Sequence, residues 1–290
     1  MKLSVITFNR NDGYKERERF IIHLRYLLET FDEVIYVDWN SPSHSLLYDI
    51  ENEIPKTGKL KHFVISSEVH TSIFGDDPHI PKVVGNLCLN IGLRRATGDW
   101  IAITTSDNIP PFKEELLNLI KESDNNTFYT LSRREVEYNE VLKNIDNLIP
   151  FKKELDKVSQ PRYFGARVTP NDEYSLINCC GDFQFAPQKI WIDIKGIEEQ
   201  MIYNCFVDTN VQKKAVLNNY NLKAIFDIPM YHMSHKNHLP QDGDTKNLHE
   251  IASKTPPIYN SAMEWVEYFT TSKNDDNWGF NNVEIEYETI

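Results

Sequence analysis

Residues 83–107 read VVGNLCLNIGLRRATGDWIAITTSD, a pattern typical of a helix followed by a tight turn and a buried strand. Val83, Leu87 and Ile91 recur every four residues, which places apolar side chains along one face of a helix. Gly98 is expected to end this helix, because glycine adopts the left-handed backbone conformation without steric strain. The segment therefore predicts an amphipathic helix that stops just before the strand.

The apolar run Trp100–Thr104 has the length of a strand. Asp107 follows shortly after the end of this run. In open α/β sheets ligands bind at the carboxyl ends of the strands, so Asp107 is a candidate binding residue.

Further apolar runs alternate with helix-like segments along the chain. Strands are expected at residues 3–8, 34–37, 60–65, 128–131 and 223–228, and helices at 20–31, 112–120, 209–219 and 261–269. This alternation predicts βαβ units, and hence an α/β fold with a mixed, mostly parallel sheet flanked by helices. Residues 133–178 are polar and give no clear pattern. We expect one large domain over residues 1–238, with residues 239–290 as a C-terminal extension packed on it.

Three carboxylates follow three of the predicted strands. Asp12 lies beyond the first strand, Asp38 directly follows the second, and Asp107 follows the strand at 100–104. Parallel strands bring these ends to one edge of a sheet, and a crevice lined in this way suits a nucleotide bound with a divalent cation. Arg10 and Asp12 are expected either to reach the same nucleotide or to lie in a solvated loop.

The overall composition argues against several classes of protein. With 290 residues, of which 40% are hydrophobic and 12% aromatic, the chain can bury a sizeable core. Its net charge of -12 argues against a binder of nucleic acids or membrane surfaces, since those need a basic footprint. No apolar run approaches the roughly 18 to 20 residues of a membrane span, and the N-terminus lacks a signal-peptide hydrophobic region, so we expect a soluble, cytoplasmic protein. The four cysteines show no CxxC spacing and are expected to be free thiols.

Several segments, in their order and spacing, resemble those of one enzyme family. Asn90–Asp107 is similar to that family's run of Asn, Gly, Ala and Gly before the strand that leads into a DxD motif, and Val37–Pro42 is similar to its aspartate after the second strand. Gly181–Phe183 and Phe206–Asp208 resemble its acceptor-side segment and the segment that holds its catalytic base. Over residues 2–238 the chain thus resembles the GT-A nucleotide-sugar glycosyltransferases, in particular the inverting family 2.

This resemblance implies transfer of a sugar from a nucleotide-diphosphate sugar, a UDP- or GDP-sugar, to a hydroxyl acceptor such as a glycan, with inversion. Mn2+ or Mg2+ would assist by stabilising the diphosphate leaving group. On this basis we assign metal binding to Asp107 and His232, nucleotide binding to Arg10, Asp12, Asp38 and Arg95, the general base to Asp208 or Glu199, and contacts with the acceptor or transferred sugar to Asp182 and Trp191.

Several of these residues also have an ordinary structural interpretation. Asp107 would cap the following helix, Asp208 would be a surface carboxylate near a helix N-terminus, His232 would be a hydrogen-bonded structural histidine, and Arg95 would complement a helix dipole. One departure from the family pattern bears on the metal. Residues 105–107 read Thr-Ser-Asp, so only the last carboxylate of a DxD motif is present.

Two other classes of protein stay open at this point. A sugar-phosphate nucleotidyltransferase shares the nucleotide-binding α/β architecture, but residues 9–13 are a poor version of its Gly-rich phosphate loop. A non-catalytic nucleotide- or carbohydrate-binding domain would account for the missing first aspartate. The polar region from about residue 239 is expected to act either as a lid over the donor or as an arm that contacts a second copy of the chain in a homodimer.

Overall fold

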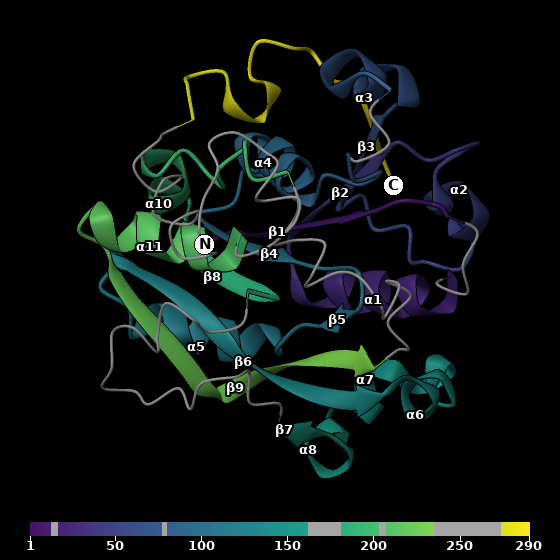
Figure 1. The fold of residues 1–290 in the computed structure, drawn as a ribbon. Coiled ribbons are helices and arrows are strands. Elements are labelled where there is room, and N and C mark those ends of the chain that lie inside the picture. Colours follow the sequence, from purple (N-terminus) through teal and green to yellow (C-terminus); the bar gives the residue numbers. More distant parts are fainter. Residues whose placement is uncertain (13–16, 77–79, 162–180, 203–206, 235–273) are drawn as a thin grey trace, which may run out of the picture.

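The computed structural model describes residues 1–12, 17–76, 80–161, 181–202, 207–234 and 274–290 (Figure 1). These residues form one mixed sheet in which the strand order is β10-β3-β2-β1-β4-β8-β6-β9-β5, with β7 paired to β6. The strands are β1 (Leu3–Asn9), β2 (Glu33–Trp39), β3 (Leu60–Ile65), β4 (Trp100–Thr104), β5 (Asn108–Ile109), β6 (Thr127–Glu137), β7 (Gln160–Pro161), β8 (Phe183–Pro187), β9 (Asn221–Ser234) and β10 (Tyr287–Thr289). The helices are α1 (Arg17–Thr30), α2 (Leu46–Ile50), α3 (Ser67–Phe74), α4 (Gly85–Arg95), α5 (Lys113–Lys121), α6 (Tyr138–Leu142), α7 (Leu148–Lys152), α8 (Leu155–Val158), α10 (Gln188–Asp193) and α11 (Val207–Leu217), with short 3-10 helices η1 (Ile145–Asn147) and η2 (Trp278–Phe280).

The sheet combines a parallel half with a mixed half. Strands β3, β2, β1 and β4 run parallel, as the βαβ pattern predicts. Beyond β4 the sheet continues with β8, which is antiparallel to both β4 and β6, and then with β9, which is parallel to β6. The α/β class and the mixed, mostly parallel sheet expected from the sequence are therefore confirmed.

Two layers of helices cover the two faces of the sheet. In β1, Leu3 and Val5 belong to the core on the face covered by α1, α2 and α5, whereas Ile6 belongs to the core on the face covered by α4, α10 and α11. Figure 1 shows α1 and α4 on opposite sides of the central strands. Since the faces are occupied, the carboxyl edge of the parallel strands is the part of the sheet left to form a site.

Strand β6 is longer than the apolar run at 128–131 indicates. It continues to Glu137 through charged residues and stays paired with β9 along this length. The charges of its second half are neutralised by ion pairs, among them Arg133 with Glu135, so a polar sequence forms a strand there. The segment after it, which gave no sequence pattern, forms α6, η1, α7, α8 and β7, and residues 162–180 lie outside the described residues.

Gly98 does not end helix α4, and the prediction that it does was wrong. The helix ends at Arg95, and Ala96 follows in an extended conformation with φ -67° and ψ 140°. Gly98 is not among the glycines with positive φ. A Cβ atom at this position would lie 2.4 Å from Oγ of Ser4 and 2.7 Å from its backbone nitrogen, so glycine is needed for the close approach of this turn to β1.

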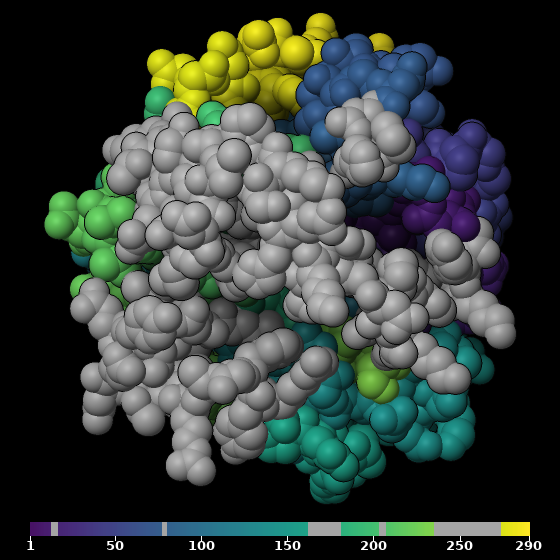
Figure 2. Space-filling model, viewed as in Figure 1, coloured from purple at the N-terminus to yellow at the C-terminus, as the bar shows by residue number. Residues whose placement is uncertain are grey.

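Residues 274–290 pack on the rest of the fold (Figure 2). β10 adds an antiparallel strand to β3, and η2 packs against α4 with Trp278 almost fully buried. The helix expected at 261–269 and the greater part of the region from 239 lie outside the described residues, so the roles of lid or dimer arm stay predictions. In the described part of the chain, no helix combines the length and the apolar character that crossing a membrane requires. Cys88 is a buried free thiol, and the other three cysteines lie outside the described residues.

Candidate functional site

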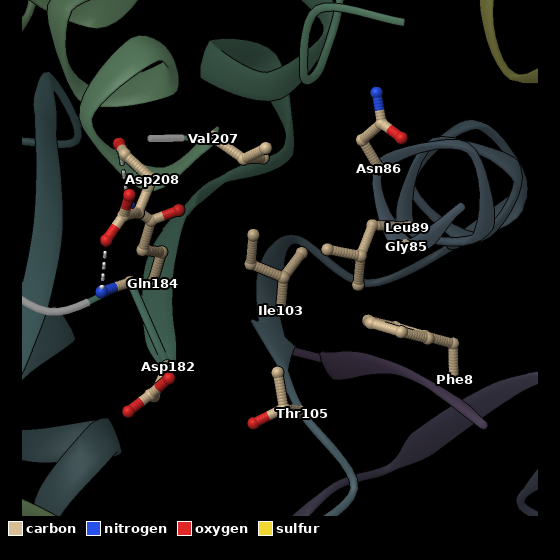
Figure 3. A pocket seen from close by; sticks show the side chains of 11 residues that line it. Phe8, Gly85, Asn86, Leu89, Ile103, Thr105, Asp182, Gln184, Val207 and Asp208 are labelled. Atoms are coloured by element: carbon tan, nitrogen blue, oxygen red, sulfur yellow. Dashed lines mark hydrogen bonds between the residues drawn. The ribbon is translucent and has the colours of Figure 1, made fainter. Parts of the chain in front are cut away.

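A cavity of about 340 Å³ lies at the carboxyl edge of the parallel strands. Its walls come from the ends of β1 and β4, the starts of β8 and α11, and the first turns of α4. Figure 3 shows Asp182, Gln184 and Asp208 on one side of this cavity and Phe8 and Leu89 on the other. One wall is therefore polar and acidic, and the opposite wall carries the apolar side chains of Phe8 and Leu89 beside Asn86.

Asp208 stands at the start of α11, where backbone amides hold its carboxylate in place. Its Oδ2 atom accepts a hydrogen bond from the backbone nitrogen of Gly181 at 3.1 Å, and its Oδ1 atom accepts one from the nitrogen of Thr209 at 2.9 Å. Burial and the nearby Asp182 raise the pKa of Asp208 in spite of these bonds. A fixed carboxylate with a raised pKa, facing a cavity, is suited to accept a proton.

Gly181 makes this position of Asp208 possible. A Cβ atom on residue 181 would lie 2.0 Å from Cβ of Asp208, closer than two carbon atoms can approach. The absence of a side chain lets the chain before β8 touch the first turn of α11 and donate its backbone N–H to the carboxylate.

A chain of alternating charges links Asp182 to Asp107 along the edge of the sheet. Arg133 donates to Oδ2 of Asp182 at 2.5 Å and forms an ion pair with Glu135 at 2.6 Å. Glu135 lies 2.8 Å from Nδ1 of His232, and Nε2 of the same imidazole lies 3.0 Å from Oδ2 of Asp107. Asp107, predicted from a strand end, and Asp182, predicted from the family resemblance, are thus connected through residues of β6 and β9.

Both ring nitrogens of His232 face carboxylates. Burial opposes protonation, but the hydrogen bonds that the imidazole donates to Asp107 and Glu135 outweigh it and raise the pKa of His232 to about 9. The imidazole is therefore protonated at neutral pH and donates from both nitrogens, and a protonated imidazole has no lone pair for a metal. Ligation of a metal by His232, as the sequence analysis expects, would require one of these hydrogen bonds to break.

Asp107 offers a carboxylate that can ligate a divalent cation, but few other side chains lie where they could ligate the same ion. In the described ranges no group of three or more His, Cys, Asp or Glu side chains is arranged to hold a metal ion. Mg2+ and Mn2+ are commonly held by one or two carboxylates together with substrate phosphates and water. The donor set at Asp107 fits a cation of that kind, bound mainly by its substrate.

The turn that carries Asp107 is fixed from several elements. Thr105 donates to Oδ1 of Asp107 at 2.7 Å, and Asn108 donates from Nδ2 to Oγ1 of Thr105 at 2.7 Å. The backbone oxygen of Asn108 lies 2.5 Å from Nδ1 of His23, a fully buried side chain of α1. Burial lowers the pKa of His23 to about 4, so this imidazole is neutral and its Nδ1–H donates to the carbonyl. Thr105 lines the cavity, so these bonds fix Asp107 beside a lining residue, although Asp107 itself is not among the residues that line it.

Asp38 lies in a second polar group at the end of β2 and is fully buried. Its Oδ1 atom accepts hydrogen bonds from Ser41 at 2.7 Å and from Tyr36 at 3.1 Å, whereas its Oδ2 atom has no partner. Burial raises the pKa of Asp38. Nearby, Arg10 donates to the backbone oxygen of Asn40 at 2.7 Å and is paired with Asp12. Three of the four predicted nucleotide residues, Arg10, Asp12 and Asp38, therefore gather around the ends of β1 and β2.

Of the sequence-predicted site residues, Asp182 and Asp208 line the cavity, whereas Glu199, Arg95 and Trp191 make contacts elsewhere in the fold. Oε1 of Glu199 accepts from Asn90 at 3.0 Å and from the nitrogen of Gly279 at 2.8 Å, and Arg95 donates to backbone oxygens of residues 91, 279, 280 and 283. Trp191 is buried in the core, where its Nε1 donates to the oxygen of Ile101 at 3.1 Å. These side chains hold the C-terminal segment and the core together.

The sequence analysis missed four residues of the site, namely His23, Arg133, Glu135 and Gln184. Arg133 and Glu135 carried one available signal, since charged residues two apart in a strand share a face. His23 and Gln184 lie inside apolar runs, and nothing in the sequence distinguishes them from ordinary polar residues of a core.

No protein-family model matches the sequence, and no curated protein matches it. Solved structures do share the fold. The mannosyltransferase PcManGT from Pyrobaculum calidifontis, in complex with GDP-Man and Mn2+, matches with a TM-score of 0.51 and 15% identity, over 87% of this chain and 61% of that chain. TarS 1-349 from S. aureus matches with a TM-score of 0.53 and 17% identity, over 97% of this chain and 71% of that chain. Its complex with UDP-GlcNAc gives 0.50 and 15%, over 95% of this chain and 68% of that chain.

At these identities the likeness shows the fold, which is the GT-A fold that the sequence resemblance implies. The chain spans less than two thirds of the length of PcManGT.

Proposed function

We propose that the protein is a glycosyltransferase that moves a sugar from a nucleotide-diphosphate sugar to a hydroxyl acceptor. The observation that carries this proposal is the cavity at the sheet edge, where Asp182 and Asp208 line one wall and the lining residue Thr105 donates a hydrogen bond to Asp107. A proton acceptor and a separate anchor for a diphosphate's counterion are the two groups that metal-assisted, inverting sugar transfer uses. The GT-A fold supports this assignment.

Asp208 is the general base in this proposal. Its carboxylate accepts the proton of the acceptor hydroxyl while that oxygen attacks the anomeric carbon and the bond to the diphosphate oxygen breaks, which inverts the configuration of that carbon. The raised pKa strengthens Asp208 as a base relative to an ordinary aspartate. Asp182, held by Arg133, orients the sugar.

The nucleotide would lie toward the ends of β1 and β2, where Asp38, Arg10 and Asp12 offer groups to its base and ribose. A bound Mn2+ or Mg2+, held by Asp107, would neutralise charge that develops on the diphosphate. His232 would then position Asp107 rather than ligate the ion, because both its nitrogens are engaged by carboxylates. PcManGT with GDP-Man and TarS with UDP-GlcNAc make GDP- and UDP-sugars the donors to try first.

Hydrolysis of the donor tests the proposal without knowledge of the acceptor, because water replaces the acceptor hydroxyl in this reaction. Native protein is incubated with UDP-GlcNAc or GDP-Man in the presence of Mn2+, of Mg2+ or of a chelator, and released UDP or GDP is measured. Asp208→Asn should lower the rate by about 100-fold or more. Asp193→Asn is the matched control, since this carboxylate lies on α10 and pairs with Lys189 at 2.5 Å, away from the cavity.

Asp107→Asn should remove the stimulation by a divalent cation. Full activity in both Asp107→Asn and Asp208→Asn would refute the assigned roles. Thermal shift adds a binding readout, because a ligand at a hundred times its Kd stabilises by about 2.7 kcal/mol, or roughly 5 °C. Binding without turnover by any donor would favour the non-catalytic domain, and neither binding nor turnover would refute the nucleotide-sugar assignment.

A further inference from the structure

One wall of the cavity holds a hydrogen-bond acceptor that has no partner. Gln184, in β8, is only 1% exposed and lines the cavity, and its Oε1 atom has no hydrogen-bond partner. A buried carbonyl without a partner has lost its hydrogen bonds to water and gained none in return, which is unfavourable. An acceptor of this kind that faces a cavity is suited to a ligand that donates to it.

The hydrogen bond made by the amide nitrogen of Gln184 fixes the orientation of the amide group. Nε2 lies 3.3 Å from the backbone oxygen of Asp208, which can only accept. The nitrogen of the amide must therefore face Asp208, and the oxygen must be the unpartnered atom. A ligand at Oε1 has to donate a hydrogen bond.

Among the described residues that line the cavity there is one other amide, that of Asn86 on the opposite side, and it has no unpartnered acceptor (Figure 3). Asn86 donates from Nδ2 to the oxygen of Glu198 at 2.8 Å, and its Oδ1 accepts from the nitrogen of Leu87 at 3.0 Å. Of the two amides among the described lining residues, Gln184 is thus the one with an acceptor atom left for a ligand.

The rest of the cavity defines the chemical class of that ligand. The carboxylates of Asp182 and Asp208 share the wall with Gln184, and none of the described residues that line the cavity is basic. A phosphate would be repelled from this wall, whereas hydroxyl groups would find acceptors. Opposite lie Phe8 and Leu89, against which the C–H face of a sugar ring can pack (Figure 3).

We propose that Gln184 is a specificity-determining residue, whose Oε1 atom accepts a hydrogen bond from a hydroxyl of an uncharged sugar ring bound in this cavity. This inference rests on the proposed function for the reaction, but it concerns the sugar and not the nucleotide. The ring belongs either to the donor or to the acceptor, and the two sources give different results in the experiment below.

The test compares Gln184→Met with Gln188→Met. Methionine keeps the length of the side chain and removes both polar atoms. Gln188 is a matched control because its Nε2 also donates to a backbone oxygen, that of Ala96 at 2.9 Å, but it does not line the cavity. Melting temperatures of both variants establish that they fold. Calorimetric titration then compares UDP with UDP-GlcNAc and GDP with GDP-Man, and saturation-transfer NMR measures binding of methyl glucoside, methyl mannoside and methyl N-acetylglucosaminide.

If the ring is that of the donor, Gln184→Met should bind the nucleotide sugar about tenfold more weakly and leave the affinity for the nucleoside diphosphate unchanged. If the ring is that of the acceptor, the affinity for the donor is unchanged and the NMR signal of the glycosides falls by a similar factor. Equal behaviour of Gln184→Met and Gln188→Met in all of these measurements would overturn the inference. Failure of every nucleotide to bind native protein would refute the proposed function alone, because the glycoside measurement still decides the role of Gln184.

Discussion

Nε2 of His232 lies 3.0 Å from Oδ2 of Asp107, and the same imidazole reaches Glu135 on its other side. The histidine belongs to β9, and the carboxylate that it holds lies in the turn after β4. The contact therefore joins two separate elements of the sheet. Because His232 carries a positive charge between two negative ones, it contributes to the stability of the fold as well as to the geometry of the site.

This pair makes the stability depend on pH in a defined direction. The pKa of His232 is about 9 in the folded protein against an ordinary value of 6.5, so the folded state binds the proton more tightly. The stabilisation is fully present below pH 6.5 and is lost as the pH rises through 9. We expect the difference in unfolding free energy between native protein and His232→Gln to shrink over this range, as measured by chemical denaturation. A difference that does not vary with pH would contradict this prediction.

The stability contributed by Glu33 should depend on pH in the opposite direction, with a loss in acid. Burial raises its pKa, but hydrogen bonds from Lys61, Ser4 and Thr97 outweigh burial and lower the pKa to about 2 from 4.5. Its contribution is therefore present above pH 4.5 and is lost as the pH falls through 2. Glu33→Gln should lower the unfolding free energy by roughly 1 to 3 kcal/mol at neutral pH, and the loss should fade in acid. A loss that stays constant down to pH 2 would show that packing, and not charge, is responsible.

Gly181→Ala should lower activity more than it lowers stability. The added methyl group would collide with Asp208, so the backbone must shift and the carboxylate must leave its place. Gly58→Ala is the comparison, because a Cβ there meets nothing within 4 Å and only the positive φ of 70° is strained. Both variants should melt at lower temperature than native protein, but only Gly181→Ala should lose donor hydrolysis. Normal hydrolysis in Gly181→Ala would mean that Asp208 need not be held by the Gly181 amide.

Glu199 and Asp208 are the two candidates for the general base. Their surroundings predict that substitutions at the two positions have different effects on activity and stability. Glu199→Gln keeps the oxygen that accepts from Asn90 and Gly279, so both activity and stability should stay close to native. Glu199→Ala should lower the unfolding free energy by about 2 kcal/mol, because two buried donors lose their acceptor. Hydrolysis rates and denaturation curves check both. If Glu199→Gln were inactive while Asp208→Asn kept its activity, the base would be Glu199.

The parallel half of the sheet could be predicted because its strands are buried on both faces. In β1, β2 and β3 nearly every side chain is apolar or buried, and such runs stand out from the helices between them. The expected limits of these strands fall within one or two residues of those in the structure. The strand-end rule then brought Asp107 and Asp38 to the correct edge.

The mixed half and its polar contacts could not be predicted in the same way. Glu135 and His232 are 97 positions apart, and His232 and Asp107 are 125 apart, so the sequence around each residue does not contain its partner. The same limit applies to Arg95 and Glu199, whose partners lie in the C-terminal segment. The spacing of apolar runs in the sequence predicts which residues follow strand ends. Whether a charged side chain then faces a cavity or a neighbouring carbonyl depends on contacts between residues far apart in the sequence.

The packing of residues 274–290 also has a consequence for how the protein is made. The backbone nitrogen of Ile290 donates to the oxygen of Leu60 at 2.9 Å, so the outer edge of β3 is covered by the last strand of the chain. During synthesis on the ribosome, β3 is complete long before β10 exists. Its edge therefore stays open for the time needed to translate about 220 further residues, roughly 10 to 45 seconds. An open edge is a place where other chains can pair, so nascent protein should be most prone to aggregation, and most dependent on chaperones, in this interval.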